Sequence, residues 1–139
     1  MSEFHLLDTN IISELARRQP EPSVVSYVGA LSQIRLSVVV FHELAHGVER
    51  VSADLSARAS LIEFVGKIRS RFGRDAIPVD LEIAETAGRL RGWSAAKGRV
   101  LHMADALIAA TAMNYDATLV TRNVKDFSFL SIRVENPFP

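Results

Sequence analysis

The chain of 139 residues contains no cysteine, which excludes disulfide bonds and cysteine-ligated zinc. It also lacks any apolar run near the roughly 20 residues that a bilayer-spanning helix needs. Its first residues carry none of the basic character of a secretory signal. These absences are compatible with a reducing compartment, and we expect a cytoplasmic protein without a membrane segment.

Net charge is absent as well, because 16 Lys and Arg balance 16 Asp and Glu. A formal charge of zero argues against bulk attraction to nucleic acid, although it leaves room for a local basic patch. No internal repeat, low-complexity tract or long linker divides the chain. With 48% hydrophobic residues, a chain of this length can bury one core unaided. We therefore expect a single domain spanning residues 1–139.

Short apolar segments alternate with helical patterns along the chain, which predicts an α/β protein with a parallel sheet covered on both faces. Strands are expected at Phe4–Leu7, Arg35–Val40, Ala76–Val79, Ala117–Thr121 and Ile132–Glu135. Helices are expected from Asp8 to about Arg18, at Ser23–Leu31, Phe41–Arg50, Ala53–Phe72 and Met103–Met113, and after Asp80.

Three carboxylates, those of Asp8, Glu43 and Asp105, lie where a strand or loop gives way to a predicted helix. In an open parallel sheet these junctions meet at the carboxyl ends of the strands, where ligands bind. Carboxylates brought together repel one another unless a divalent cation holds them. The pattern therefore predicts a Mg²⁺ or Mn²⁺ site for phosphate chemistry. Each acid alone is also compatible with helix capping, and Asp126, the fourth candidate, with capping of a short turn.

Neutral polar and basic residues flank these acids. Four neutral side chains could orient a bound water or a carboxylate, or serve in ordinary caps and turns: Thr9, Asn10, Thr121 and Asn123. Four basic side chains could contact an RNA backbone or form a solvated surface: Arg17, Lys97, Arg99 and Arg122. Trp93 is expected to be a packing residue rather than a platform for bases, since no aromatic stripe surrounds it.

A competing motif overlaps one of the acids. The segment His42-Glu43-Leu44-Ala45-His46 fits the H-E-x-x-H pattern of zinc metallopeptidases, in which both histidines bind zinc and the glutamate is the general base. No third histidine follows at the spacing that metzincins show. The zinc hypothesis also leaves Asp8 and Asp105 unexplained, and so short a pattern often arises by chance.

Taken together and in order, these segments resemble the PIN-domain ribonucleases, specifically VapC-type toxins and their FitB-like relatives. The resemblance covers Leu6–Leu15, Glu43–Val48, Asp105–Ala112, Thr121–Phe127 and Asn136–Phe138. It implies a three-layer α/β/α sandwich with a mostly parallel central sheet. It also implies a Mg²⁺- or Mn²⁺-dependent endoribonuclease that hydrolyses RNA phosphodiester bonds.

By motif, the family's metal-binding acids fall on Asp8, Glu43 and Asp105, and these three with Asp126 are the candidate catalytic residues. Relatives differ at the fourth position, where some have an acid at Asn123 and others at Asp126. The resemblance further implies a homodimeric toxin that is held by a cognate antitoxin, in some cases as a higher assembly. A catalytically inactive binding module of the same fold is an alternative, against which the retained acids count.

Overall fold

A computed structural model describes residues 3–51 and 53–139 of the chain. Its central sheet has four strands: β1 (His5–Leu7), β2 (Ile34–Arg35), β3 (Thr118–Val120) and β4 (Arg133–Glu135). The strand order is β2-β1-β3-β4, and all three pairings are parallel. The expected parallel sheet is therefore confirmed, with β1 and β3 at its centre.

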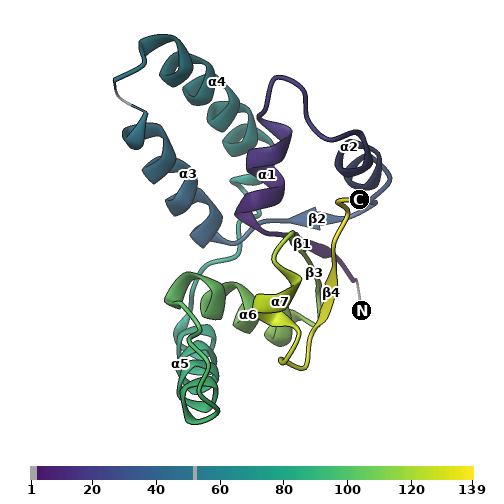
Figure 1. Cartoon of the computed structure of the whole chain (residues 1–139), viewed down its shortest axis with the longest axis vertical. Helices are drawn as coiled ribbons and strands as arrows, with labels where there is room; N and C mark the ends of the chain where they lie inside the picture. The colour runs from purple at the N-terminus through teal and green to yellow at the C-terminus, as the bar shows by residue number, and fades with distance from the viewer. Residues whose placement is uncertain (1–2, 52) are drawn as a thin grey trace.

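Helices cover both faces of this sheet. They are α1 (Thr9–Leu15), α2 (Pro22–Gly29), α3 (Val38–Arg50), α4 (Leu55–Phe72), α5 (Leu81–Ala96), α6 (Met103–Tyr115) and α7 (Val124–Phe127). In Figure 1, α1 to α4 gather on one side of the strands, and α5 and α6 lie on the other. This arrangement confirms the α/β/α sandwich. Among the described residues, no helix is both long and apolar enough to span a bilayer.

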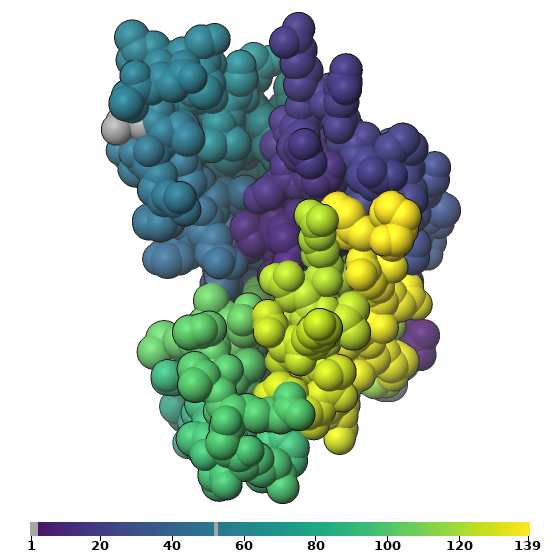
Figure 2. Space-filling view, in the orientation of Figure 1, coloured from purple at the N-terminus to yellow at the C-terminus, as the bar shows by residue number. Residues whose placement is uncertain are grey.

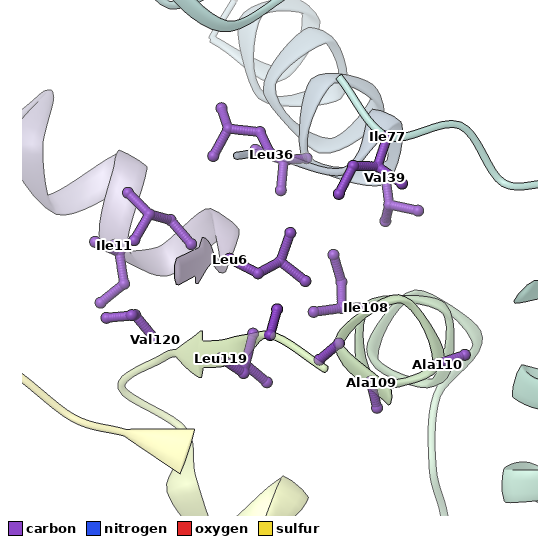
Figure 3. Packing of buried hydrophobic residues seen from close by; sticks show 14 of the residues in the cluster. Leu6, Ile11, Leu36, Val39, Ile77, Ile108, Ala109, Ala110, Leu119 and Val120 are labelled. Atoms are coloured by element: carbon purple, nitrogen blue, oxygen red, sulfur yellow. The ribbon is translucent and has the colours of Figure 1, made fainter. Parts of the chain in front are cut away.

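The central strands and the helices on either side of them share one hydrophobic core. Figure 3 shows Leu6 of β1 in the middle of this core, with Ile11 of α1 on one side and Ile108 of α6 on the other. Helix α6 is buried nearly all round, as its composition predicted, and its alanines let it pack closely on the sheet. Asp116, in the left-handed conformation with φ of 52°, ends this helix.

Two expected strands are wrong. The segment Arg35–Val40 was predicted as one strand from its β-branched residues, but β2 ends at Arg35 and α3 begins at Val38. Ser37 causes the switch, because its hydroxyl accepts a hydrogen bond from the Val39 amide at 3.0 Å and caps the helix. The segment Ala76–Val79 forms only an isolated bridge between Ile77 and Ser37, and the next residue is a proline, which has no N–H for a ladder.

Candidate active site

Asp8 lies at the carboxyl end of β1, directly beside Thr121 at the end of β3. The parallel register that pairs Leu7 with Val120 brings these two residues together. The Thr121 hydroxyl donates to Asp8 Oδ2 at 2.9 Å, and the Thr9 amide donates to Asp8 Oδ1 at 2.8 Å. The side-chain amide of Asn10 adds a longer bond to Oδ2, at 3.3 Å. The Asp8 carboxyl is therefore held in a fixed orientation at the start of α1.

This carboxyl is almost fully buried, with 5% of Asp8 exposed. Burial raises the pKa of Asp8 above its usual value, and the nearby Glu43 carboxyl adds to the rise. The hydrogen bonds from Thr121, Thr9 and Asn10 oppose it, because they stabilise the charged form. All three donors are neutral. The surrounding residues thus stabilise the charge of the Asp8 carboxylate only in part.

Glu43 reaches the same site from α3. It lies in the second turn of the helix that begins at Val38, rather than at a strand–helix junction as predicted. The Thr9 hydroxyl donates to Glu43 Oε1 at 2.5 Å, within the short range of hydrogen bonds to an ionised oxygen. Thr9 therefore ties both acids to the start of α1, Asp8 through its amide and Glu43 through its hydroxyl.

Asp105 enters from the opposite layer, in the first turn of α6. The pKa of Asp105 is raised to about 6, mainly by partial burial and then by the carboxylates of Asp8, Asp126 and Glu43 in that order. The rise shows that four acids from different elements lie within electrostatic range of one another. A divalent cation placed among them would remove this repulsion.

The acids open into one pocket of about 620 Å³ at the carboxyl edge of the sheet. It is lined by Asp8, Thr9, Asn10, Ser13, Glu14, Arg17, Glu43, Asp105, Arg122 and Asn123. Three of the four predicted acids therefore share one pocket with three of the four neutral residues and two of the four basic ones. Thr121 does not line it, but its hydroxyl lies just behind Asp8.

Two residues, Asn123 and Asp126, are candidates for the fourth position of the acidic site. Asn123 lines the pocket, and its backbone amide donates to the Thr121 hydroxyl at 3.1 Å. Asp126 is exposed in the first turn of α7 and lines a neighbouring pocket of about 360 Å³, which Asn123 and Arg122 also line. Asp126 therefore lies at the rim, near enough to raise the pKa of Asp105.

Ser13 and Glu14 also line the pocket, although neither was singled out in the sequence as a site residue. Glu14 is buried, accepts a hydrogen bond from the Glu21 amide at 2.9 Å and pairs with Arg17 at 3.3 Å. The Glu21 amide, mainly, holds the pKa of Glu14 below its usual value. The sequence did contain a signal for Glu14. It is an acid on the inner face of a short helix whose other inward-facing residues are apolar.

The remaining predicted residues lie outside this pocket. Lys97 and Arg99 are exposed, and their cationic groups lie over the rings of Trp93 and Phe129. His42 and His46 are exposed on α3 and do not line the pocket. The H-E-x-x-H segment thus places its glutamate in the site and leaves both histidines outside it.

The donor set fits a hard cation such as Mg²⁺ or Mn²⁺. No salt bridge in the described part of the chain includes Asp8, Glu43 or Asp105, so their negative charge has no cationic partner there. Within residues 3–51 and 53–139, no three His, Cys, Asp or Glu side chains form a group that could hold a metal ion by themselves. An open site suits Mg²⁺, which is usually held by one or two carboxylates and keeps several waters and substrate phosphate oxygens.

Sequence comparison places the chain among known proteins. The family model of the PIN domain matches residues 5–130. Toxin FitB of Neisseria gonorrhoeae is 30% identical over 96% of this chain and 97% of its own length. Ribonuclease VapC1 of Rickettsia felis is 32% identical over 88% of this chain and 87% of its own length.

Solved structures agree with this placement. A crystal structure of FitAcB from Neisseria gonorrhoeae matches with a TM-score of 0.86 and 32% identity, covering 96% of this chain and 97% of that one. A toxin–antitoxin complex from Klebsiella pneumoniae matches with a TM-score of 0.68 and 27% identity, covering 96% and 98%. The chain therefore belongs to the PIN-domain family and, within it, to the VapC-type toxins that include FitB.

Proposed function

We propose that the chain is a Mg²⁺- or Mn²⁺-dependent endoribonuclease, formed by a single PIN domain over residues 1–139, and that it is the toxin of a type II toxin–antitoxin pair. The observation that carries this proposal is the open pocket in which Asp8, Glu43 and Asp105 meet without a cationic partner. Relatives that match along most of the chain are ribonucleases by name. Its substrate would be the RNA of the cytoplasm.

In this proposal Asp8, Glu43 and Asp105 bind the cation, with Asp126 or Asn123 at the fourth position. The bound cation supplies an activated water and neutralises charge on the scissile phosphate. The hydroxyls of Thr9 and Thr121 fix the orientation of Glu43 and Asp8. Asn10 links the start of α1 to the segment after β3. Its side-chain amide donates to the Thr121 hydroxyl, and its side-chain oxygen accepts from the Arg122 backbone amide.

Arg17 and Arg122 are the basic residues that line the pocket, and both are exposed. In this proposal their guanidinium groups bind phosphates on either side of the cleaved bond. Such contacts position a strand without reading its sequence.

His46→Ala separates this proposal from the zinc peptidase alternative. Only the zinc hypothesis makes His46 a metal ligand, so the variant should retain Mg²⁺-dependent RNA cleavage at a rate within about twofold of the wild type. Initial rates on a labelled single-stranded RNA measure this, and metal analysis of the purified protein accompanies them. Stoichiometric zinc that is lost in the variant together with a peptidase activity would overturn the ribonuclease assignment.

Thr121→Val tests the positioning of Asp8. Valine keeps the shape of threonine but removes the hydroxyl. This hydroxyl donates to Asp8 Oδ2 and accepts from the side-chain amide of Asn10 and the backbone amide of Asn123. Losing this donor should raise the pKa of Asp8 further and weaken cation binding about tenfold, as for other residues that orient metal ligands. The Mg²⁺ concentration for half-maximal cleavage measures the effect. Thr118→Val, at the start of β3 and outside the pocket, should leave it unchanged.

An inhibitor is expected because an unregulated ribonuclease would degrade the cell's own RNA. The acidic pocket offers an antitoxin a target, since an inserted Arg or Lys could pair with the carboxylates in place of the cation. Exposed apolar residues on α4, with Leu55 78% and Ile62 50% exposed, offer a surface for an antitoxin helix. We propose that the chain forms a homodimer, which the antitoxin can join into a higher assembly.

Expression of the isolated chain should therefore arrest bacterial growth, and co-expression of a small adjacent gene should restore it. Colony counts after induction measure the effect, and Asp8→Asn serves as the matched harmless control. A chain that is harmless alone and monomeric by light scattering at micromolar concentration would contradict the toxin assignment while leaving the nuclease assignment standing.

A further inference from the structure

An aromatic pair lies on the surface away from the acidic pocket. The rings of Trp93, on α5, and Phe129, just after α7, stack with centroids 5.9 Å apart and planes inclined by 10°. The Lys97 ammonium lies 4.9 Å from the Trp93 ring centre, and the Arg99 guanidinium lies 4.6 Å from the Phe129 ring centre. We call these four residues the stacked platform. The sequence showed no aromatic stripe around Trp93, but the fold brings one aromatic ring, that of Phe129, against it.

The platform is open to solvent. Trp93 is 45% exposed, which leaves a large apolar ring in contact with water. Beside the two rings lies a pocket of about 290 Å³, lined by Thr86, Arg89, Leu90, Trp93, Met113, Phe129, Leu130 and Ser131. Its size is near the lower end of small-molecule sites, about 300–1,000 Å³, and suits one planar ring system.

The charge around the platform has one sign. Residues 86–104 contain four basic side chains (Arg89, Arg91, Lys97 and Arg99) and no Asp or Glu, in a chain whose formal charge is zero. Arg91 is used within the fold, where it donates to the Leu101 carbonyl at 3.1 Å. In the described part of the chain, neither Lys97 nor Arg99 forms a salt bridge. This local excess favours a polyanionic partner.

The platform is also connected to the acidic pocket through the chain. Arg99 precedes α6, whose first turn carries Asp105, and Phe129 follows α7, which carries Asp126. The contact of Arg99 with Phe129 holds these two connections together. In Figure 2 the green surface near residue 100 and the yellow-green surface near residue 130 adjoin on the face shown. The platform therefore lies next, along the chain, to the two segments that carry Asp105 and Asp126.

We propose that the stacked platform is a second contact for the RNA substrate, at which an unpaired base takes the place of Lys97 over the exposed ring of Trp93 while Lys97 and Arg99 bind the adjoining phosphates. The inference rests on the proposed ribonuclease function. Proteins bind single strands by combining aromatic faces with a basic track, and each stacked base adds affinity with little regard to sequence. Paired bases are already stacked within a duplex, so the platform would favour single-stranded RNA.

The sequence supplies its own reporter, because Trp93 is the only tryptophan in the chain. We would titrate the full chain in EDTA, which suppresses metal-dependent cleavage, with a 12-nucleotide single-stranded RNA and record tryptophan emission. Stacking of a base should quench this emission. An RNA of equal length that lacks bases should bind more weakly and leave the emission unchanged, as should a duplex of the same sequence.

Variants separate stacking from charge in the same assay. Trp93→Leu should raise the dissociation constant, measured by fluorescence anisotropy of labelled RNA, by roughly tenfold, the ratio for about one stacked base. Trp93→Phe keeps an aromatic face and should recover most of the affinity. Lys97→Glu and Arg99→Glu should each weaken binding several-fold. Arg74→Glu reverses an exposed charge elsewhere and should change little.

The outcomes also separate this inference from the function on which it rests. Wild-type protein that cleaves RNA with Mg²⁺, yet shows unchanged tryptophan emission at saturating RNA, would overturn the platform alone. Equal quenching by the duplex would overturn it too. Emission that varies with protein concentration, together with a monomeric Trp93→Leu variant, would assign the surface to contacts between copies of the chain. Absence of both binding and cleavage would reject the ribonuclease function and the platform together.

Discussion

Replacing Asp8 or Asp105 with asparagine should lower the rate of RNA cleavage about a hundredfold or more, without unfolding the protein. The amide keeps the shape of each side chain but removes the charge that binds the cation. Losing one preorganised electrostatic group at a reacting centre commonly has an effect of about 10²–10³. Initial rates on a labelled single-stranded RNA at fixed Mg²⁺ concentration measure the loss.

Glu63→Gln is the matched control for these two variants. Glu63 is an exposed acid on α4 that pairs only with Lys67, at 3.6 Å, and surface pairs of this kind contribute little to stability. The control should cleave RNA at the wild-type rate. Circular dichroism should show all three variants folded. Full activity in either Asp8→Asn or Asp105→Asn would reject the carboxylate site.

Asp105→Asn should also make the cation-free protein more stable at pH 7. The pKa of Asp105 is raised to about 6, mainly by burial and then by the other acids, so its ionised form is disfavoured in the folded state. Each pKa unit corresponds to about 1.4 kcal/mol, and the rise therefore costs the wild type about 1–3 kcal/mol when Asp105 is charged. Asparagine carries no charge and avoids this cost.

The pH dependence follows from the same shift. In the unfolded chain Asp105 ionises near pH 3.8, whereas in the folded protein it ionises near pH 6. The unfolded state therefore binds fewer protons between these values, and the stability of the wild type falls as pH rises through them. The difference in free energy of unfolding between Asp105→Asn and the wild type should be largest at pH 7 and roughly half as large at pH 5.

Urea unfolding in EDTA at pH 5 and pH 7 measures this difference. Added Mg²⁺ should stabilise the wild type at pH 7 more than it stabilises Asp105→Asn, because a ligand that binds the folded state adds more stability the more tightly it binds. A variant that is less stable than the wild type at pH 7 in EDTA would show that Asp105 has a structural role instead of an electrostatic cost.

The positions of Asp8 and Asp105 were predictable because each follows from local chain geometry. Asp8 directly succeeds a strand and caps α1, and Asp105 opens a helix too apolar to need an acid for solubility. Glu43 was predicted at a junction that does not exist, since Ser37 ends the preceding segment early and starts α3 at Val38. Its motif pointed to a residue that lines the acidic pocket, although the expected secondary structure was wrong.

Other features depend on contacts between distant segments, which a local pattern does not contain. The stacking of Trp93 on Phe129 joins α5 to the segment after α7. The bond between Thr9 and Glu43 joins α1 to α3 and makes Thr9 an orienting residue rather than only a turn former. The difference between Asn123 in the pocket and Asp126 at its rim likewise arises from where α7 packs against the sheet.

The most direct test of the cation-dependent carboxylate site is RNA cleavage by the purified protein during a single metal titration. Protein stripped with EDTA should leave a labelled single-stranded RNA intact, and added Mg²⁺ or Mn²⁺ should restore cleavage in the wild type but not in Asp8→Asn. Cleavage that continues at full rate in excess EDTA, or that Asp8→Asn performs as well as the wild type, would contradict the account.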